Sequence, residues 1–187
     1  MGAREQTGRL TESPRFAGSR GRCIQRPFLC VRPTGDAWSS GAQEYGKKTL
    51  DRFTAEFAKW MRGDPRVKDD RAVSQSNIAD YNLVLFGDPG SNSLIARIAG
   101  KLPIGWTKTE ITMGSKKFSA AEHIPVLIYP NPLNPKRYVV INSGHTFGEK
   151  EFRGANALLF PRLGDYAVMA PDGAVVISGF FNENWQF

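Results

Sequence analysis

The order of hydrophobic and polar positions is clearest over residues 82–100, which read NLVLFGDPGSNSLIARIAG. An apolar β-branched run leads into a Gly/Pro loop, and apolar positions at helical spacing follow. This succession of strand, tight loop and helix is typical of an open α/β sheet. In such sheets ligands lie beyond the carboxyl ends of the strands. The pattern therefore predicts a fold class and a candidate site in the loop 88–92.

Helical periodicity predicts three longer helices. The first, at about 42–62, has an apolar stripe that we expect to face the core, followed by the stop signal Gly63-Asp64-Pro65. The second, at about 92–101, has Ser91 or Asn92 as its N-cap and Gly100 near its end. The third lies at about 148–159, and Ser76 is expected to cap a short turn. The stripe of the first helix consists of Leu50, Phe53, Phe57, Trp60 and Met61.

Short apolar runs predict the strands. The run at 27–33 is wholly apolar around Cys30, which indicates a strand buried on both faces. The strands 126–129 and 138–142 are joined by PNPLNPKR, whose three prolines leave no room for a helical crossover. They are therefore antiparallel neighbours or belong to different parts of the sheet. The remaining predicted strands are 82–87, a hairpin at 110–119 that turns at Gly114-Ser115, and the pair 166–169 and 174–177 around Pro171-Asp172-Gly173.

These elements predict a three-layer α/β sandwich, Rossmann-like or flavodoxin-like, with a mixed, mostly parallel sheet and an inserted β-hairpin. A length of 187 residues with 41% apolar residues suits one domain. We assign that domain to 27–187 and expect its aromatic end, 180–187, to be packed. Residues 1–26 lack hydrophobic periodicity and are predicted to be a disordered, Arg-rich tail.

The charge is unevenly distributed. Of the net +7, the first 26 residues contribute +4, from six Arg against two Glu, and the remaining 161 residues contribute +3. Such a tail favours at most weak nucleic-acid binding, which we keep as an alternative although nucleic acid is an unlikely partner. No apolar run approaches the roughly 18 residues of a membrane span, so no membrane association is expected. Cys23 and Cys30 do not form a metal-ligand pair, and a disulfide between them is not expected.

The first candidate site is the loop Asp88-Pro89-Gly90-Ser91-Asn92. A loop that opens a helix presents backbone N–H groups and the positive end of the helix dipole, which suit a phosphate, sulfate or carboxylate. Ser91 and Asn92 could add side-chain donors. The loop has neither the Lys-Ser/Thr of a P-loop nor three glycines. A well-capped strand-to-helix turn with no ligand is the alternative interpretation.

The second candidate site is 142–146, which also follows an apolar strand and contains Asn142, Ser143 and His145. If that strand runs parallel to 82–87, the two loops share one edge of the sheet. Ser143 and His145 are only two positions apart, a spacing that rarely lets two side chains form a nucleophile–base pair, whereas His145 with Ser91 could form one across the edge of the sheet. A loop histidine that only forms a hydrogen bond is the alternative. The other histidine, His123, precedes Pro125 in a loop-like segment.

Several chemical motifs are missing from the sequence. It has no G-x-S-x-G nucleophile elbow, no H-x-x-x-H pair and no C-x-x-C motif. Asp69-Asp70 stands between Lys68 and Arg71 and is typical of a solvated loop. We therefore expect no metal, no cofactor and no complete enzyme.

Four segments together resemble the C-terminal domain of bacterial α/β-hydrolase proteins related to prolyl oligopeptidases and esterases. The resemblance covers about 27–187 and implies an accessory α/β module beside a hydrolase-like region that would carry any nucleophile elbow. That family is generally exported, to the periplasm or outside the cell. No catalytic residue is carried over, and whether the chain is a fragment or a free-standing copy stays open. The segments are RPFLCVRPTG, IADYNLVLFGDPGSNSLIARIAGKLPIGW, HIPVLIYPNPLNPKRYVVINSGHTF and GFFNENWQF.

The function predicted from the sequence is therefore that of a non-catalytic accessory or binding module. It would pair with an α/β-hydrolase-like domain and hold a small polar or anionic ligand at the strand ends. The ligand-binding residues would be Asp88, Gly90, Ser91, Asn92, Asn142, Ser143 and His145. The alternative is a serine hydrolase that uses Ser91 or Ser143 with His145.

Overall fold

The computed structural model describes residues 26–143 and 163–187. The predicted tail (except Arg26), the helix at 148–159, Cys23 and His145 lie outside these residues. Seven strands form the larger sheet: β1 (Phe28–Arg32), β2 (Val67–Asp69), β3 (Asn82–Leu85), β7 (Ile124–Asn131), β8 (Asn134–Ile141), β9 (Tyr166–Met169) and β10 (Val175–Gly179). A smaller sheet contains β4 (Ile104–Trp106), β5 (Glu110–Met113) and β6 (Lys116–Ser119). The α-helices are α2 (Ser40–Met61), α3 (Gln75–Asp80) and α4 (Ser93–Ile98), with 3₁₀ turns at Asp70–Ala72 and Ala99–Lys101.

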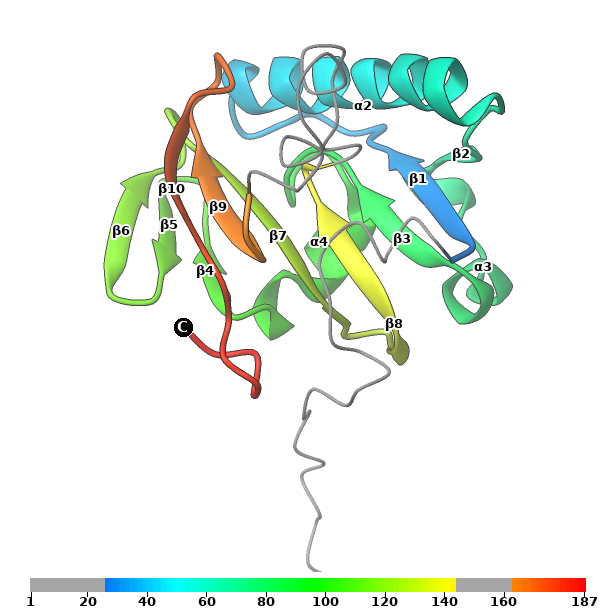
Figure 1. Cartoon of the computed structure of the whole chain (residues 1–187). Helices are drawn as coiled ribbons and strands as arrows, with labels where there is room; N and C mark the ends of the chain where they lie inside the picture. The colour runs from blue at the N-terminus through cyan, green and yellow to red at the C-terminus, as the bar shows by residue number, and fades with distance from the viewer. Residues whose placement is uncertain (1–25, 144–162) are drawn as a thin grey trace, which may run out of the picture.

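The larger sheet has the order β10-β9-β7-β8-β3-β1-β2 (Figure 1). β1 pairs in parallel with β2 and β3, and β3 pairs in parallel with β8. β7 is antiparallel to β8 and β9, and β9 is antiparallel to β10. Hence β2, β1, β3, β8 and β9 run one way, and β7 and β10 run the other. The prediction of a mixed, mostly parallel sheet is confirmed. Of the two alternatives for the strands around PNPLNPKR, the structure shows the antiparallel pair.

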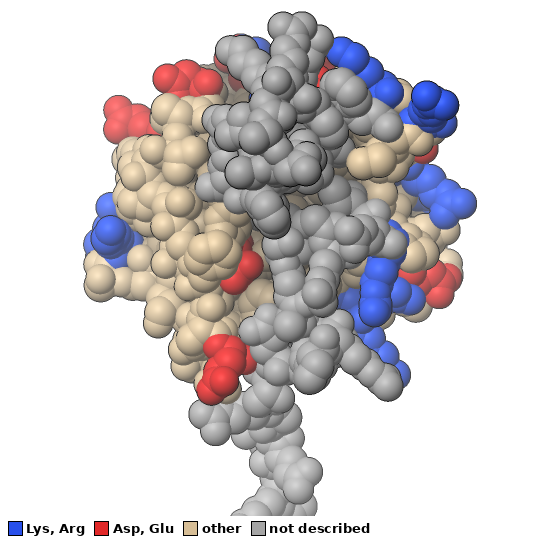
Figure 2. Space-filling model, in the orientation of Figure 1, with Lys and Arg blue, Asp and Glu red and all other residues tan. Residues whose placement is uncertain are grey.

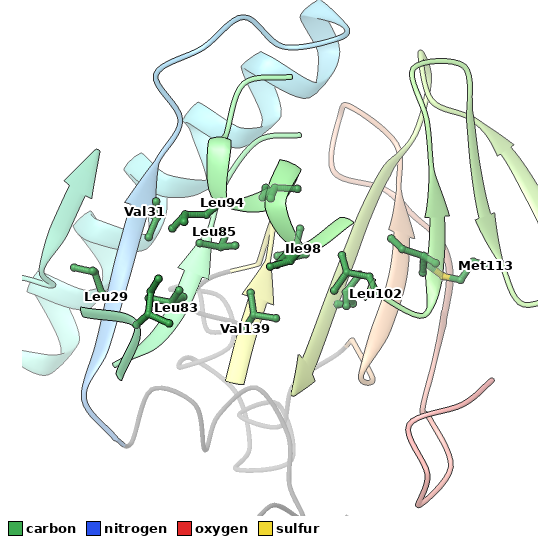
Figure 3. Packing of buried hydrophobic residues seen from close by; sticks show 14 of the residues in the cluster. Leu29, Val31, Leu83, Leu85, Leu94, Ile98, Leu102, Met113 and Val139 are labelled. Atoms are coloured by element: carbon green, nitrogen blue, oxygen red, sulfur yellow. The ribbon is translucent and has the colours of Figure 1, made fainter. Parts of the chain in front are cut away.

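Alternate residues of a strand point to opposite faces of the sheet. In this sheet the residues on both faces are apolar, and each set packs with a different helix. Figure 3 shows Leu94 and Ile98 of α4 against Leu29, Leu83 and Val139 of the strands. The residues between them in sequence face the other way: Cys30, Val84 and Val140 pack with Leu50 and Phe53 of α2. The near-continuous apolar runs of β1 and β3 follow from this double burial.

The small sheet lies beside β9 and β10 in Figure 1. β5 and β6 are antiparallel on either side of Gly114 and Ser115, and Gly114 has a φ of 60°. A third strand, β4, pairs with β5 and was not predicted. Ile104 and Met113 of this sheet join the core cluster that contains α4, so both sheets share one apolar core.

Some sequence predictions are corrected by the structure. Met61 is 51% exposed and does not face the core; it is the last residue of α2, directly before the C-cap Arg62 in the left-handed conformation (φ 54°). The short helix α3 is capped by Ser74, not Ser76, in a capping box with Asn77. Gly100 does not end α4 but lies within the 3₁₀ turn that continues it. At the aromatic end Phe181 and Trp185 are buried, whereas Phe180 is 73% exposed. None of the described helices has the length and apolar character needed to cross a membrane.

Candidate functional site

The chain segments that begin the two predicted loops, Gly87 and Asn142, meet at one edge of the sheet. β8 runs parallel to β3, and Asn142, which follows β8, bonds the backbone of Gly87, which follows β3. Gly87 N–H donates to Asn142 Oδ1 and Asn142 Nδ2 donates to Gly87 O, both over 2.8 Å. Asn142 also donates to Pro125 O at 3.3 Å. Both partners adopt positive φ, 101° at Gly87 and 53° at Asn142, which Gly and Asn tolerate best.

The carboxylate of Asp88 organises the loop that follows. Its Oδ2 accepts from Trp38 N at 2.7 Å, and its Oδ1 accepts from Gly90 N at 3.1 Å and Ser91 N at 2.9 Å. The Ser91 hydroxyl donates to Asp88 Oδ1 at 2.9 Å and accepts from Asp88 N at 3.0 Å. Asp88 and Ser91 are both buried. The polar side chains of this loop therefore satisfy its own backbone.

The backbone N–H groups at the start of α4 also donate hydrogen bonds to side chains of this chain. Asn92 is the N-cap, as predicted: its Oδ1 accepts from Leu94 N at 3.0 Å and Ile95 N at 3.3 Å. Ser93 N donates to Asp70 Oδ2 at 2.7 Å. A capping amide and a carboxylate thus occupy the N–H groups on which the predicted anion site depends.

Asp70 is a structural residue, which corrects its interpretation as part of a solvated loop. Only 3% of it is exposed, and its Oδ1 accepts from the Thr34 hydroxyl at 2.6 Å. Burial by itself would raise the pKa of Asp70, but the hydrogen bonds from Ser93 and Thr34 outweigh that effect and lower it. The charged carboxylate therefore joins the loop after β1 to the start of α4. Its neighbour Asp69 is exposed and pairs with Arg32.

A cleft adjoins these loops at the carboxyl ends of β1 and β3. Trp38 comes from the segment after β1, Asp88 from the loop after β3, and Trp106 from β4. The two indole rings are 6.5 Å apart between centroids and nearly perpendicular, at 86°. Gly90 makes room for this arrangement, since a Cβ there would lie 2.5 Å from Trp38 Cδ1. The empty volume is ≈ 220 Å³ with open solvent included. The cleft is lined by Trp38, Ala42, Asp88, Trp106, Ala120, His123, Ile124 and Pro125.

His123 contributes an imidazole to the cleft. Its Nδ1 lies 2.9 Å from Ser119 O, and a carbonyl oxygen can only accept a hydrogen bond. In the neutral ring the proton is therefore on Nδ1, and Nε2 is left as an acceptor. The ring also packs against Phe118, with centroids 5.5 Å apart.

Ser91 and Ser143, the two serines considered as nucleophiles, have different surroundings. Ser91 is 3% exposed, and its hydroxyl is engaged with Asp88 rather than with an imidazole. Ser143 is buried directly after Asn142. His145 lies outside the described residues, so its separation from either serine stays a prediction. Over residues 26–143 and 163–187, no cluster of three or more His, Cys, Asp or Glu could hold a metal ion.

Sequence patterns do not predict the place of Trp38 and Trp106 in the cleft, and they predict only a loop around His123. They are distant in sequence and meet only through the fold. The one local signal was Trp38 directly before Ser39, the N-cap of α2. Comparison with protein families, curated proteins and solved structures gives no match to this chain.

Proposed function

We propose that this chain is a non-catalytic α/β binding module that holds a small ligand in the cleft between Trp38 and Trp106. Four parallel strands have the order β8-β3-β1-β2, with β1 and β3 side by side and their helices on opposite faces. In doubly wound sheets, ligands bind where the strand order reverses in this way. We assign the domain to a flavodoxin-like, three-layer sandwich on that basis.

The hydrogen bonding of Ser91 carries the non-catalytic part of the proposal. A serine nucleophile needs a base that accepts its proton, normally an imidazole within hydrogen-bond reach. Ser91 is buried and instead donates to Asp88, whose carboxylate also holds three backbone N–H groups. The loop 87–92 then serves as a rigid wall of the cleft. The rival proposal, a hydrolase with Ser91 or Ser143 and His145, requires this bonding to be rearranged.

We also propose that the module pairs with an α/β-hydrolase-like domain, as its resemblance implies. The surface that suits such a partner is the outer edge of the sheet at β10. There Val175 and Val176 are 50% and 44% exposed, and Phe180 is exposed beside them. An uncharged edge strand whose outer side pairs with no other described strand favours association, whereas Lys68 and Asp69 on β2 protect the opposite edge. Figure 2 shows Lys and Arg side chains gathered on the side where β1, β2 and α3 lie in Figure 1.

The coding sequence upstream of Met1 tests the pairing. An in-frame hydrolase-like region would support it. An in-frame stop codon directly before Met1, with no hydrolase gene adjacent, would count against it.

A ligand screen on the full chain tests the binding proposal. The indole N–H signals of Trp38 and Trp106 can be assigned by ¹H–¹⁵N NMR with the variants Trp38→Phe and Trp106→Phe. A panel of small cations, anions and neutral compounds should contain a class that shifts both signals saturably and leaves that of the buried Trp185 unchanged. If no compound of any class shifts them, the cleft is not a binding site.

A further inference from the structure

The charge of the cleft points to one class of ligand. Asp88 is the charged residue among those that line it, and no Lys or Arg is among them. Its two oxygens act only as acceptors, as an ionised carboxylate does, and all four donors are neutral groups. Within the described part of the chain, the ion pairs between side chains do not include Asp88. The wall of the cleft therefore carries a carboxylate that forms no ion pair with any Lys or Arg of the described residues.

From this charge, and building on the binding function proposed above, we propose that the cleft binds a primary alkylammonium group. The group could belong to a lysine side chain of a peptide or to a free alkylamine, which have the same –CH₂–NH₃⁺ chemistry. An anion is disfavoured at the same place, because it would face the carboxylate of Asp88 at short range.

The two tryptophans suit a cation. Both indoles line the cleft, and their rings are nearly perpendicular, with centroids 6.5 Å apart. The face of an indole attracts a positive charge through its quadrupole, and Trp is the best aromatic residue for this interaction. The alkyl stem of the ligand can lie along the indole surfaces, where the apolar Ala42 and Ile124 also line the cleft.

His123 offers a hydrogen-bond acceptor when its ring is neutral. Since Nδ1 bonds Ser119 O, the neutral ring offers Nε2, and an ammonium group has three N–H donors to place. The donors that an anion would need are the backbone N–H groups of the loop and of α4, and these already bond Asp88, Asn92 and Asp70.

The size of the cleft selects a small head group. The ≈ 220 Å³ of empty space in the cleft includes open solvent, and the part that a water-sized group can occupy is ≈ 10 Å³, about one such group. An –NH₃⁺ group is close to water in size, whereas a quaternary ammonium with three methyl groups is larger.

Matched ligands test the proposal on the full chain, with the indole N–H signals of Trp38 and Trp106 as the readout. n-Butylammonium chloride is titrated against 1-pentanol, a neutral analogue of similar length, and sodium valerate, at constant ionic strength. We expect saturable shifts with n-butylammonium, binding at least tenfold weaker with pentanol, and no saturable shift with valerate. Nα-acetyl-lysine amide forms a further arm: binding at least tenfold tighter than n-butylammonium would identify a peptide as the source of the amine.

Variants separate the site from general effects on the fold. Trp106→Leu should weaken n-butylammonium binding at least tenfold, and Trp106→Phe should retain most of it. Met61→Leu, at an exposed position that does not line the cleft, should leave it unchanged. If pentanol or valerate binds as well as n-butylammonium, the ammonium proposal is wrong while the cleft remains a binding site. If none of these ligands shifts either indole and the wider screen also fails, both proposals are wrong. Equal affinities in wild type and Trp106→Leu would likewise overturn the inference.

Discussion

The side chain of Asn142 bonds both backbone groups of Gly87, with two hydrogen bonds of 2.8 Å each. It thereby joins the ends of β8 and β3 and leaves neither polar group of Gly87 unsatisfied. A third bond, to Pro125 O, extends the link to β7. The edge of the sheet beside the cleft is thus held by one buried amide, and the stability of this edge should depend on it.

Replacing Asn142 tests that dependence. Asn142→Ala leaves buried backbone groups without partners, and we expect a loss of about 2–4 kcal/mol in the free energy of unfolding, measured by urea titration. Asn142→Asp should also destabilise, because a carboxylate cannot donate to Gly87 O. The control Gln186→Ala removes an exposed amide and should change the free energy by less than about 0.5 kcal/mol. Equal effects of Asn142→Ala and Gln186→Ala would contradict this role.

Two glycines provide a matched pair at the same end of the fold. Gly87 has a φ of 101°, and a Cβ there would collide with Ser91 Oγ and lie 3.2 Å from Pro33 Cβ. Gly87→Ala should therefore cost about 2–4 kcal/mol of stability through left-handed strain and overpacking. A Cβ at Gly100 would meet no atom within 4 Å, and its φ is not positive, so Gly100→Ala should be neutral or stabilise by up to about 1 kcal/mol. Thermal unfolding of both variants checks the prediction, which fails if they shift the midpoint alike.

The stability contributed by Asp70 should depend on pH. Its pKa is lowered in the folded chain, so its contribution is complete above the unfolded-state pKa of about 3.9 and is lost as the pH falls through the folded value. Asp70→Asn should cost about 1–3 kcal/mol at pH 7, and the difference from wild type should shrink below about pH 4.

Urea titrations of wild type and Asp70→Asn between pH 3 and pH 7 measure this difference. Asp69→Asn is the control, because Asp69 is exposed and its pair with Arg32 should contribute about 0–1 kcal/mol. A difference between wild type and Asp70→Asn that stays constant over the whole range would refute a charged structural role for Asp70.

Local sequence patterns predicted those strands and helices whose own residues show an apolar run, a helical stripe or a capping residue. β1 and β3 are apolar runs because both of their faces are buried, α2 has a helical stripe, and Asn92 is a strong N-cap. β2 was missed because its three residues, VKD, have no periodicity and form a strand only by pairing with β1.

The site was less predictable, for a physical reason. The loop 88–92 and its meeting with Asn142 follow from strand order, which the sequence suggests. The burial of Asp70 depends on Thr34 and Ser93, which are distant along the chain. Trp38, Trp106 and His123 come from three separate segments, and no local pattern brings them together.

The most direct test of the central claim is hydrolysis by the full chain and its variants. A panel of p-nitrophenyl esters and peptides is assayed with wild type, Ser91→Ala, Ser143→Ala and His145→Ala. We predict the same background rate for all four proteins, while Ser91→Ala loses about 1–3 kcal/mol of stability because Asp88 N–H is left without its partner. Turnover by the wild type that falls at least a hundredfold in both a serine variant and His145→Ala would contradict the account and establish a hydrolase.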